Sequence, residues 1–221
     1  EVKDMSFTAS VGGESVDGTY SGTVKKNIPK GNGTFVARNS QGDQFTYEGE
    51  WKNGLFDGEG KLFSDDPGYN IQEGNFSKGE FNPTPYQFFK ALGTRKGNQY
   101  EITPAAEKYL EKYPDVFLEN SARSSDINEK FNYKAFRSNP KKFGDSLIRV
   151  SSVRVNQLVS VPLWGKDHTF CIVSDMDGEN KFFICMFGKT EPLSEGAVIS
   201  FTALPMAFFT YESTTGKKVE A

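Results

Sequence analysis

The sequence predicts a mainly β protein with a few short helices, of the α+β class. Aromatic residues make up 14% of the 221 residues, with 20 Phe and 9 Tyr, and there are 22 Gly. This composition favours strands and tight turns over long helices. A repeated aromatic-glycine pattern in the first part and several apolar β runs in the last part indicate the same class. A chain of this length has room for two domains, and no apolar run approaches the roughly 18 residues of a membrane helix.

The aromatic-glycine pattern is clearest in YEGEWKNGLFDGEG, which spans residues 47–60. The same offsets occur in a weaker copy that begins at Tyr20, and a third, incomplete copy ends before Pro83. Internal periodicity of this kind predicts a fold of stacked units. The repeated positions are Tyr20, Gly22, Tyr47, Gly49, Trp51, Gly54, Gly58, Gly60, Gly74, Phe76 and Gly79.

The spacing explains the residue types. Tyr47, Gly49 and Trp51 would face one side of a strand, where the glycine leaves room for large rings on neighbouring strands. The turn at 52–54 would reverse the chain, so each unit is a hairpin with one aromatic face that only stacking can bury. We therefore interpret the motif as the scaffold of an antiparallel β-hairpin sheet over residues 1–83. The alternative is that exposed parts of this face, such as Tyr47 or Trp51, also contact a ligand.

The pattern resembles the MORN repeat (membrane occupation and recognition nexus). Its signature, Tyr-x-Gly-x-Trp-x-x-Gly-x-x-x-Gly-x-Gly, is matched at every position by residues 47–60, and the resemblance covers about residues 17–81. It implies an elongated, twisted sheet. We do not expect the membrane binding that the family name suggests, because residues 1–83 carry an excess of acidic over basic residues.

Residues 84–141 predict a helical linker. Thr84 followed by Pro85 is a typical helix start, and Gly93 would end that helix. A second helix is predicted from Thr103-Pro104 to Pro114, and a third after Ser125 or Asp126, ending at Asn139-Pro140. The stretch GTRKGNQ (93–99) lacks a preceding apolar strand and a Gly-Lys-Ser/Thr ending, so we interpret it as an ordinary loop and not a phosphate-binding loop.

Residues 142–221 predict an OB-like five-stranded barrel. The first strand is long, and Met176 to Glu179 forms a hairpin signal between the second and third strands. Five strands of which the first is long are typical of a small Greek-key barrel of the OB type. The predicted strands are 146–161, 169–175, 181–187, 197–204 and 208–213.

Residues 136–155 and 208–219, with their Asn-Pro and Tyr-Glu-Ser-Thr elements, resemble a domain found in secreted proteins and lipoproteins of Gram-positive bacteria. The resemblance implies an OB-like barrel and an extracytoplasmic location, either secreted or anchored at the cell surface. The chain begins EVKDMSF, without an initiator Met or an apolar signal segment, so we expect a processed start.

The residues that could carry chemistry do not form a recognised site. His168, the single histidine, has Asp167 beside it and Cys171 three places on, but this adjacency does not bring three side chains together on a strand. We interpret His168 as a loop residue at a strand entrance. No spacing suits zinc or calcium, and no catalytic motif occurs, so we expect neither a metal, nor a cofactor, nor enzymatic activity.

The two cysteines leave two alternatives open. A three-residue loop at 177–179 would place Cys171 and Cys185 directly opposite each other, and a cross-strand disulfide would be possible in an oxidising compartment. A two-residue loop would offset them by one. The other alternative is two free, mostly buried thiols.

These observations predict a non-enzymatic extracytoplasmic binding module. OB barrels bind ligands on the face of strands two and three and in the flanking loops, which selects Trp164, His168, Phe183 and Tyr211 as candidate ligand contacts. A net charge of −3 favours a glycan or cell-wall polymer over nucleic acid. One alternative is a structural scaffold that holds a partner protein at the edges of the repeat sheet. Another is a hydrolase that uses a pair of carboxylates.

Overall fold

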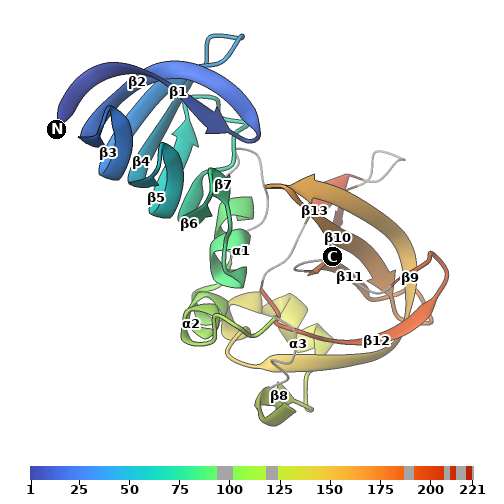
Figure 1. Cartoon of the computed structure of the whole chain (residues 1–221). Coiled ribbons are helices and arrows are strands. Elements are labelled where there is room, and N and C mark those ends of the chain that lie inside the picture. The colour runs from blue at the N-terminus through green and yellow to red at the C-terminus, as the bar shows by residue number, and fades with distance from the viewer. Residues whose placement is uncertain (94–101, 118–123, 187–191, 207–209, 213–217, 221) are drawn as a thin grey trace. The chain divides into compact units, whose positions relative to one another are not determined.

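The computed structural model describes residues 1–93, 102–117, 124–186, 192–206, 210–212 and 218–220. The chain forms two compact units, Glu1–Asn98 and Gln99–Ala221. The first predicted helix lies in the first unit, and the other two lie in the second. Strands are the main element of both units, so the predicted mainly β class is confirmed (Figure 1). No helix in the described residues is long and apolar enough to cross a membrane.

The first unit is built on a seven-stranded antiparallel sheet in which each strand pairs with the next along the chain (Figure 1). It is therefore a meander of hairpins, as the repeat predicts. Its strands are β1 (Val2–Val11), β2 (Glu14–Lys25), β3 (Ile28–Arg38), β4 (Gln44–Lys52), β5 (Leu55–Ser64), β6 (Gln72–Ser77) and β7 (Glu80–Phe81).

A row of directly paired glycines crosses five adjacent strands of this sheet. The row consists of Gly22, Gly33, Gly49, Gly60 and Gly74. The ring of Tyr20 fills the space over the first two, and the ring of Tyr47 fills the space over the next two. A β-carbon at any of these four positions would collide with a tyrosine or with the neighbouring strand. The glycines of the repeat are thus needed for close packing of rings on the sheet.

The aromatic residues of the repeats form the core of the first unit. Tyr47 stacks on Phe56 with ring centroids 3.7 Å apart and planes 10° from parallel, and Trp51 meets Tyr20 edge-on at 5.0 Å. The Tyr47 hydroxyl donates a hydrogen bond to the Glu50 carbonyl at 2.9 Å. Tyr47 is fully buried and Trp51 is 2% exposed. The alternative that these two side chains contact a ligand is therefore wrong.

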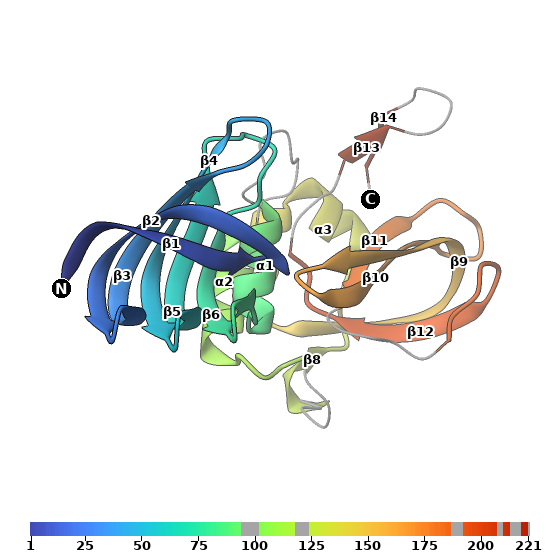
Figure 2. The ribbon, with the colours of Figure 1, turned by 45° about the horizontal axis from the view of Figure 1, so that its top comes forward.

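The N-terminal strand β1 covers part of the aromatic face. Phe7 packs edge-on against Trp51, with ring centroids 5.9 Å apart, and Ala9 is buried. The Ser10 carbonyl lies 3.7 Å from the position of a β-carbon at Gly79, in the turn between β6 and β7. Figure 2 shows β1 running across the other strands. The β1–β2 hairpin therefore bends over the sheet and seals the rings from solvent.

Helix α1 (Pro85–Gly93) closes the last strands of the same unit. Its start is the predicted one, and it has a reciprocal capping box: the Thr84 hydroxyl accepts from the Gln87 amide, and Gln87 Oε1 accepts from the Thr84 amide at 2.9 Å. The Gln87 side chain also occupies the space over Gly74. The incomplete third copy therefore has a glutamine from α1 where complete copies have a tyrosine ring.

The second unit begins with short helices. In α2 (Pro104–Lys112) the Thr103 hydroxyl accepts from the Ala106 amide at 3.2 Å, so the predicted cap is confirmed. The 3₁₀ helix η1 (Ser124–Asp126) precedes β8 (Ile127–Asn128), and η2 (Pro140–Lys142) follows α3 (Tyr133–Ser138). The loop predicted at 93–99 lies almost entirely outside the described residues.

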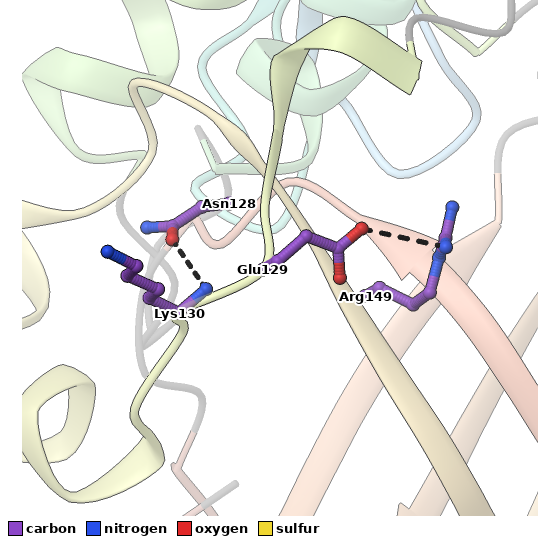
Figure 3. Close-up of polar contacts among 4 residues, drawn as sticks. All are labelled: Asn128, Glu129, Lys130 and Arg149. Carbon is purple, nitrogen blue, oxygen red and sulfur yellow. Dashed lines mark hydrogen bonds and ion pairs between the residues drawn. The ribbon is translucent and has the colours of Figure 1, made fainter.

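The predicted start of the third helix is wrong, because α3 begins at Tyr133 with Asn132 as its cap. Ile127 and Asn128 instead form β8, which pairs in parallel with β9. Two contacts hold the segment that follows (Figure 3). Asn128 Oδ1 accepts from the Lys130 amide at 3.0 Å and turns the chain, and Glu129 pairs with Arg149 at 3.6 Å. Strand pairing and the asparagine turn override the helical spacing of the apolar residues.

The second unit contains a curled sheet with the strand order β11-β10-β9-β12. The strands are β9 (Leu147–Leu163), β10 (Lys166–Ser174), β11 (Lys181–Met186) and β12 (Val198–Ala203), close to the predicted ranges. The long β9 pairs with β12 over its first half and with β10 over its second half, so the sheet curls around a core. The last predicted strand is β13 (Thr210–Glu212), which pairs with β14 (Lys218–Glu220) in a separate ribbon.

Candidate functional site

The sheet of the second unit has one face on its core and one face away from it. Cys171 and Val173 of β10 point into the core, so Phe170 and Ile172 point to the opposite side. The strand register then defines this opposite side, which we call the outer face. Its central members are Gln157, Val159 and Val161 of β9, His168, Phe170 and Ile172 of β10, and Phe183 and Cys185 of β11, and Lys166 and Ser174 of β10 lie on the same face at its two ends.

The outer face carries an apolar surface that is partly open to solvent. The rings of Phe170 and Phe183 lie nearly parallel, with centroids 5.9 Å apart and planes 28° from parallel, and both are half-buried. Val159 pairs with Phe170 across the strands and is 43% exposed. We call Val159, Phe170, Ile172 and Phe183 the platform. Because apolar side chains on a solvent-facing sheet surface often mark a binding site, the platform is the candidate site.

Cations lie at one end of the platform. Lys181 of β11 and Arg154 of β9 both pair with Ser174 of β10, one on each side, so the three residues form one cross-strand row. Arg154 is exposed and Lys181 is half-buried. Between them the short Ser174 is buried, and its hydroxyl donates to Asn156 Oδ1 at 3.4 Å. The row therefore places one long basic side chain on each side of the short, buried Ser174.

His168 lies at the other end of the outer face, and its predicted place in a loop is wrong. It is part of β10, pairs with Val161 and is 3% exposed. Burial and the neighbouring Lys166 lower its pKa, against smaller opposing effects of a hydrogen bond with the Met186 backbone and of Asp167. The neutral ring thus packs inside the protein and does not present itself to a ligand. Cys171 faces the core, so the two side chains do not form a catalytic pair.

The other three predicted ligand contacts are Trp164, Phe183 and Tyr211, and they lie in different parts of the second unit. Trp164 lies in the two-residue turn between β9 and β10, with φ of 51° at Trp164 and 73° at Gly165. Both values are left-handed, as in the type I′ turns that suit the twist of a hairpin. Phe183 belongs to the platform. Tyr211 belongs to β13, but its side chain lies outside the described residues.

The two cysteines are free thiols. The register pairs Cys171 with Ile184 and Cys185 with Phe170, so the cysteines are offset by one residue and point to opposite faces of the sheet. The directly opposed geometry that a cross-strand disulfide requires is absent from this hairpin. Burial raises the pKa of the Cys171 thiol to about 11.

Comparison with known protein families gives one match, and it falls on the first unit. The family model of the MORN repeat matches residues 20–41 and 47–66. The N-terminal sheet contains MORN repeats. The matched MORN residues cover most of β2 to β5, and the incomplete third copy, with Gln87 over Gly74, follows them. Among curated proteins and among solved structures, no match to the chain is found.

Of the four platform residues, the sequence predicted Phe183 as a ligand contact and did not single out Val159, Phe170 or Ile172. The runs TFCIVSD and KFFICMF are apolar on both faces, so alternation alone does not reveal which residues point outward. The strand register is what brings Phe170 beside Phe183 and Arg154 into one row with Lys181. A correct loop length between β10 and β11 could have provided that register.

Proposed function

We propose that this chain is a non-enzymatic binding module whose platform binds a glycan. The observation that carries the proposal is the near-parallel pair of Phe170 and Phe183 on the outer face of the second unit. Sugar rings have apolar faces, and such faces can pack against the partly exposed edges and faces of aromatic side chains. The exposed Val159 beside Phe170 extends the surface along the sheet.

The strand connectivity supports an OB-like classification of the curled sheet. A long first strand pairs with the second strand over one half and with the fourth strand over the other half, and the third strand pairs with the second. Such barrels bind oligosaccharides on the face of strands two and three and in the adjoining loops. In this chain those strands are β10 and β11, and Trp164 lies in the adjoining turn.

The chemistry of the outer face favours binding over hydrolysis. None of its eight central residues carries a carboxylate, whereas glycoside hydrolysis needs a pair of them at the bound sugar. The net charge of −3, and the restriction of Arg154 and Lys181 to one end of the platform, favour a glycan over nucleic acid.

We further propose an extracytoplasmic location at a bacterial cell surface, where the ligand would be a cell-wall polymer. The support is the resemblance of residues 136–155 and 208–219 to domains of secreted proteins and lipoproteins. The MORN sheet would then serve as a rigid support, since its aromatic face is sealed by β1 and α1.

A titration of soluble glycans tests the proposal. Calorimetry would compare the parent protein with Phe170→Leu, which keeps an apolar side chain and removes the ring, and with the matched control Phe63→Leu in β5. We expect at least one glycan to bind saturably, with equal affinity for the parent and Phe63→Leu and about tenfold weaker affinity for Phe170→Leu. Equal binding by both variants, or no saturable glycan in a panel of chitin, cellulose, pectin and peptidoglycan fragments, contradicts the proposal.

A protein scaffold is the second candidate function, and the polar face of the MORN sheet favours it. The side opposite the rings carries Glu48, Glu50, Glu59 and Glu73, and Lys61 on the same side pairs with Glu73 at 3.4 Å. Such an acidic face would suit a basic partner protein. A scaffold of this kind predicts association that weakens with added salt and that is insensitive to Phe170→Leu.

A further inference from the structure

We infer that the ligand of the platform carries a single anionic group, which Arg154 and Lys181 hold at the end of the aromatic surface. This inference rests on the proposed glycan binding and names the class of glycan: an acidic sugar, with a carboxylate or phosphate beside an apolar ring face. Three features of the described residues lead to it.

The first feature is placement. Arg154 lies between the core residues Val153 and Val155, so its side chain points to the outer face, and Lys181 shares the face of Phe183 two residues later. The two cations stand on either side of Ser174 in one row, two strand spacings or about 10 Å apart at the backbone. Both side chains are long enough to reach a group above the short serine.

The second feature is that no carboxylate among the described residues forms an ion pair with either cation, Arg154 or Lys181. Arg149, on the same strand as Arg154, differs because it pairs with Glu129 at 3.6 Å (Figure 3). The carboxylates of Asp175 and Glu195 bind backbone amides instead of these cations: Asp175 accepts from the Glu179 amide at 2.9 Å, and Glu195 accepts from the Leu158 amide.

The third feature is the distribution of charge. Between this row and Lys166, which lies at the far end of β10 beyond the buried His168, the members of the outer face carry no charged side chain. A nucleic acid has a phosphate on every nucleotide and would need cations along the whole surface. One anionic group next to a neutral ring fits one cationic row next to one aromatic platform. The shared chemistry of carboxylates and phosphates leaves a uronic acid, a lactyl-bearing amino sugar and a sugar phosphate as sources.

Paired probes separate charge from shape. Calorimetry would measure binding of trigalacturonate against its methyl ester, of the disaccharide of N-acetylglucosamine and N-acetylmuramic acid against its carboxamide, and of glucose 6-phosphate oligomers against unphosphorylated ones. The protein forms are the parent, Arg154→Gln, Lys181→Gln and the matched control Arg149→Gln. We expect an acidic member to bind at least tenfold more tightly than its neutral partner. Arg154→Gln and Lys181→Gln should each remove most of that difference, whereas Arg149→Gln should preserve it.

Each other outcome is decisive. Equal affinity for acidic and neutral members, with a loss in Phe170→Leu, keeps the proposed function and overturns the inference. A loss in Arg149→Gln equal to that in Arg154→Gln shows general electrostatic attraction and also overturns it. Failure of every probe to bind overturns both. Tighter binding of an oligothymidylate than of any sugar, lost in Arg154→Gln and Phe170→Leu, assigns the face to single-stranded nucleic acid instead.

Discussion

Tyr47 holds its hydroxyl and ring edge directly over Gly60, in the space that a β-carbon at position 60 would need. The ring of Tyr47 also stacks on Phe56, and its hydroxyl donates a hydrogen bond to the Glu50 carbonyl, so the side chain cannot move away without losing both contacts. The aromatic and glycine positions of the repeat are therefore one packing unit, even though they lie on different strands.

Replacement of Gly60 by alanine should destabilise the first unit by about 1–3 kcal/mol, since the added methyl group overpacks the site beneath Tyr47. Urea unfolding followed by the fluorescence of Trp51, in a Trp164→Phe background, reports this unit alone, because the chain has two tryptophans. Gly68→Ala is the control, since its added carbon would lie near one side chain only, that of Asp66, at 3.2 Å from Oδ1. Equal stability of the two variants would show that the glycine row is not required for packing.

Loss of the Gln87 side chain should expose the end of the MORN sheet. Gln87→Ala removes the acceptor of the Thr84 amide and empties the space over Gly74, at a cost of about 1 kcal/mol. Hydrogen exchange of β6 and β7 would then be faster than in the parent. Gln87→Glu keeps the accepting oxygen and the shape, so we expect a smaller change. Equal effects of alanine and glutamate would show that the accepting oxygen of Gln87 is not required.

The second unit should lose stability as the pH falls, because of His168. Burial lowers the pKa of this side chain in the folded state, so the unfolded chain, with a histidine pKa of about 6.5, takes up the proton first. Stability should decrease as the pH drops below about 7 and level off once the folded form also titrates. Urea midpoints between pH 8 and pH 5, read from Trp164 in a Trp51→Phe variant, check this slope, and His168→Gln should flatten it. If stability still falls with pH to the same extent in His168→Gln, other titrating groups cause the decrease.

Both cysteines should be present as thiols that react slowly in the folded protein. Burial raises the pKa of Cys171 to about 11, and burial together with Cys171 also raises the pKa of Cys185. Thiolate, the reactive form, is therefore scarce at neutral pH. Mass spectrometry after maleimide treatment should find little labelling of the native chain and two labels in urea without reductant. Fewer than two labels in urea would indicate an oxidised pair.

The elements that the sequence predicted well are those with local chemical signals. Thr84 and Thr103 cap their helices through their own hydroxyls, and Gly54 lies in the turn that separates two strands of the repeat. These signals depend only on residues within a few positions of one another. The third helix failed because Ile127 pairs with Leu147, a contact that local spacing cannot reveal.

The candidate site was harder to predict, since it depends on register and burial. Phe183 was identified on a strand, but its neighbour Phe170 and the row of Arg154 and Lys181 follow from which residues pair. His168 looked like a loop residue because Trp164 and Gly165 turn the chain in only two residues, so β10 begins earlier than the apolar run suggests. The sequence also could not predict that β1 buries part of the aromatic face of the MORN sheet, since this burial arises from a bend of the β1–β2 hairpin.

The most direct test of the central claim is an NMR titration of the labelled protein with a glycan that binds it. Binding on the platform predicts that the largest shifts fall on Val159, Phe170, Ile172 and Phe183, that Arg154 and Lys181 follow for an acidic glycan, and that Tyr47 and Trp51 of the MORN sheet do not shift. Shifts concentrated on the MORN sheet, with the platform unchanged, would contradict the account.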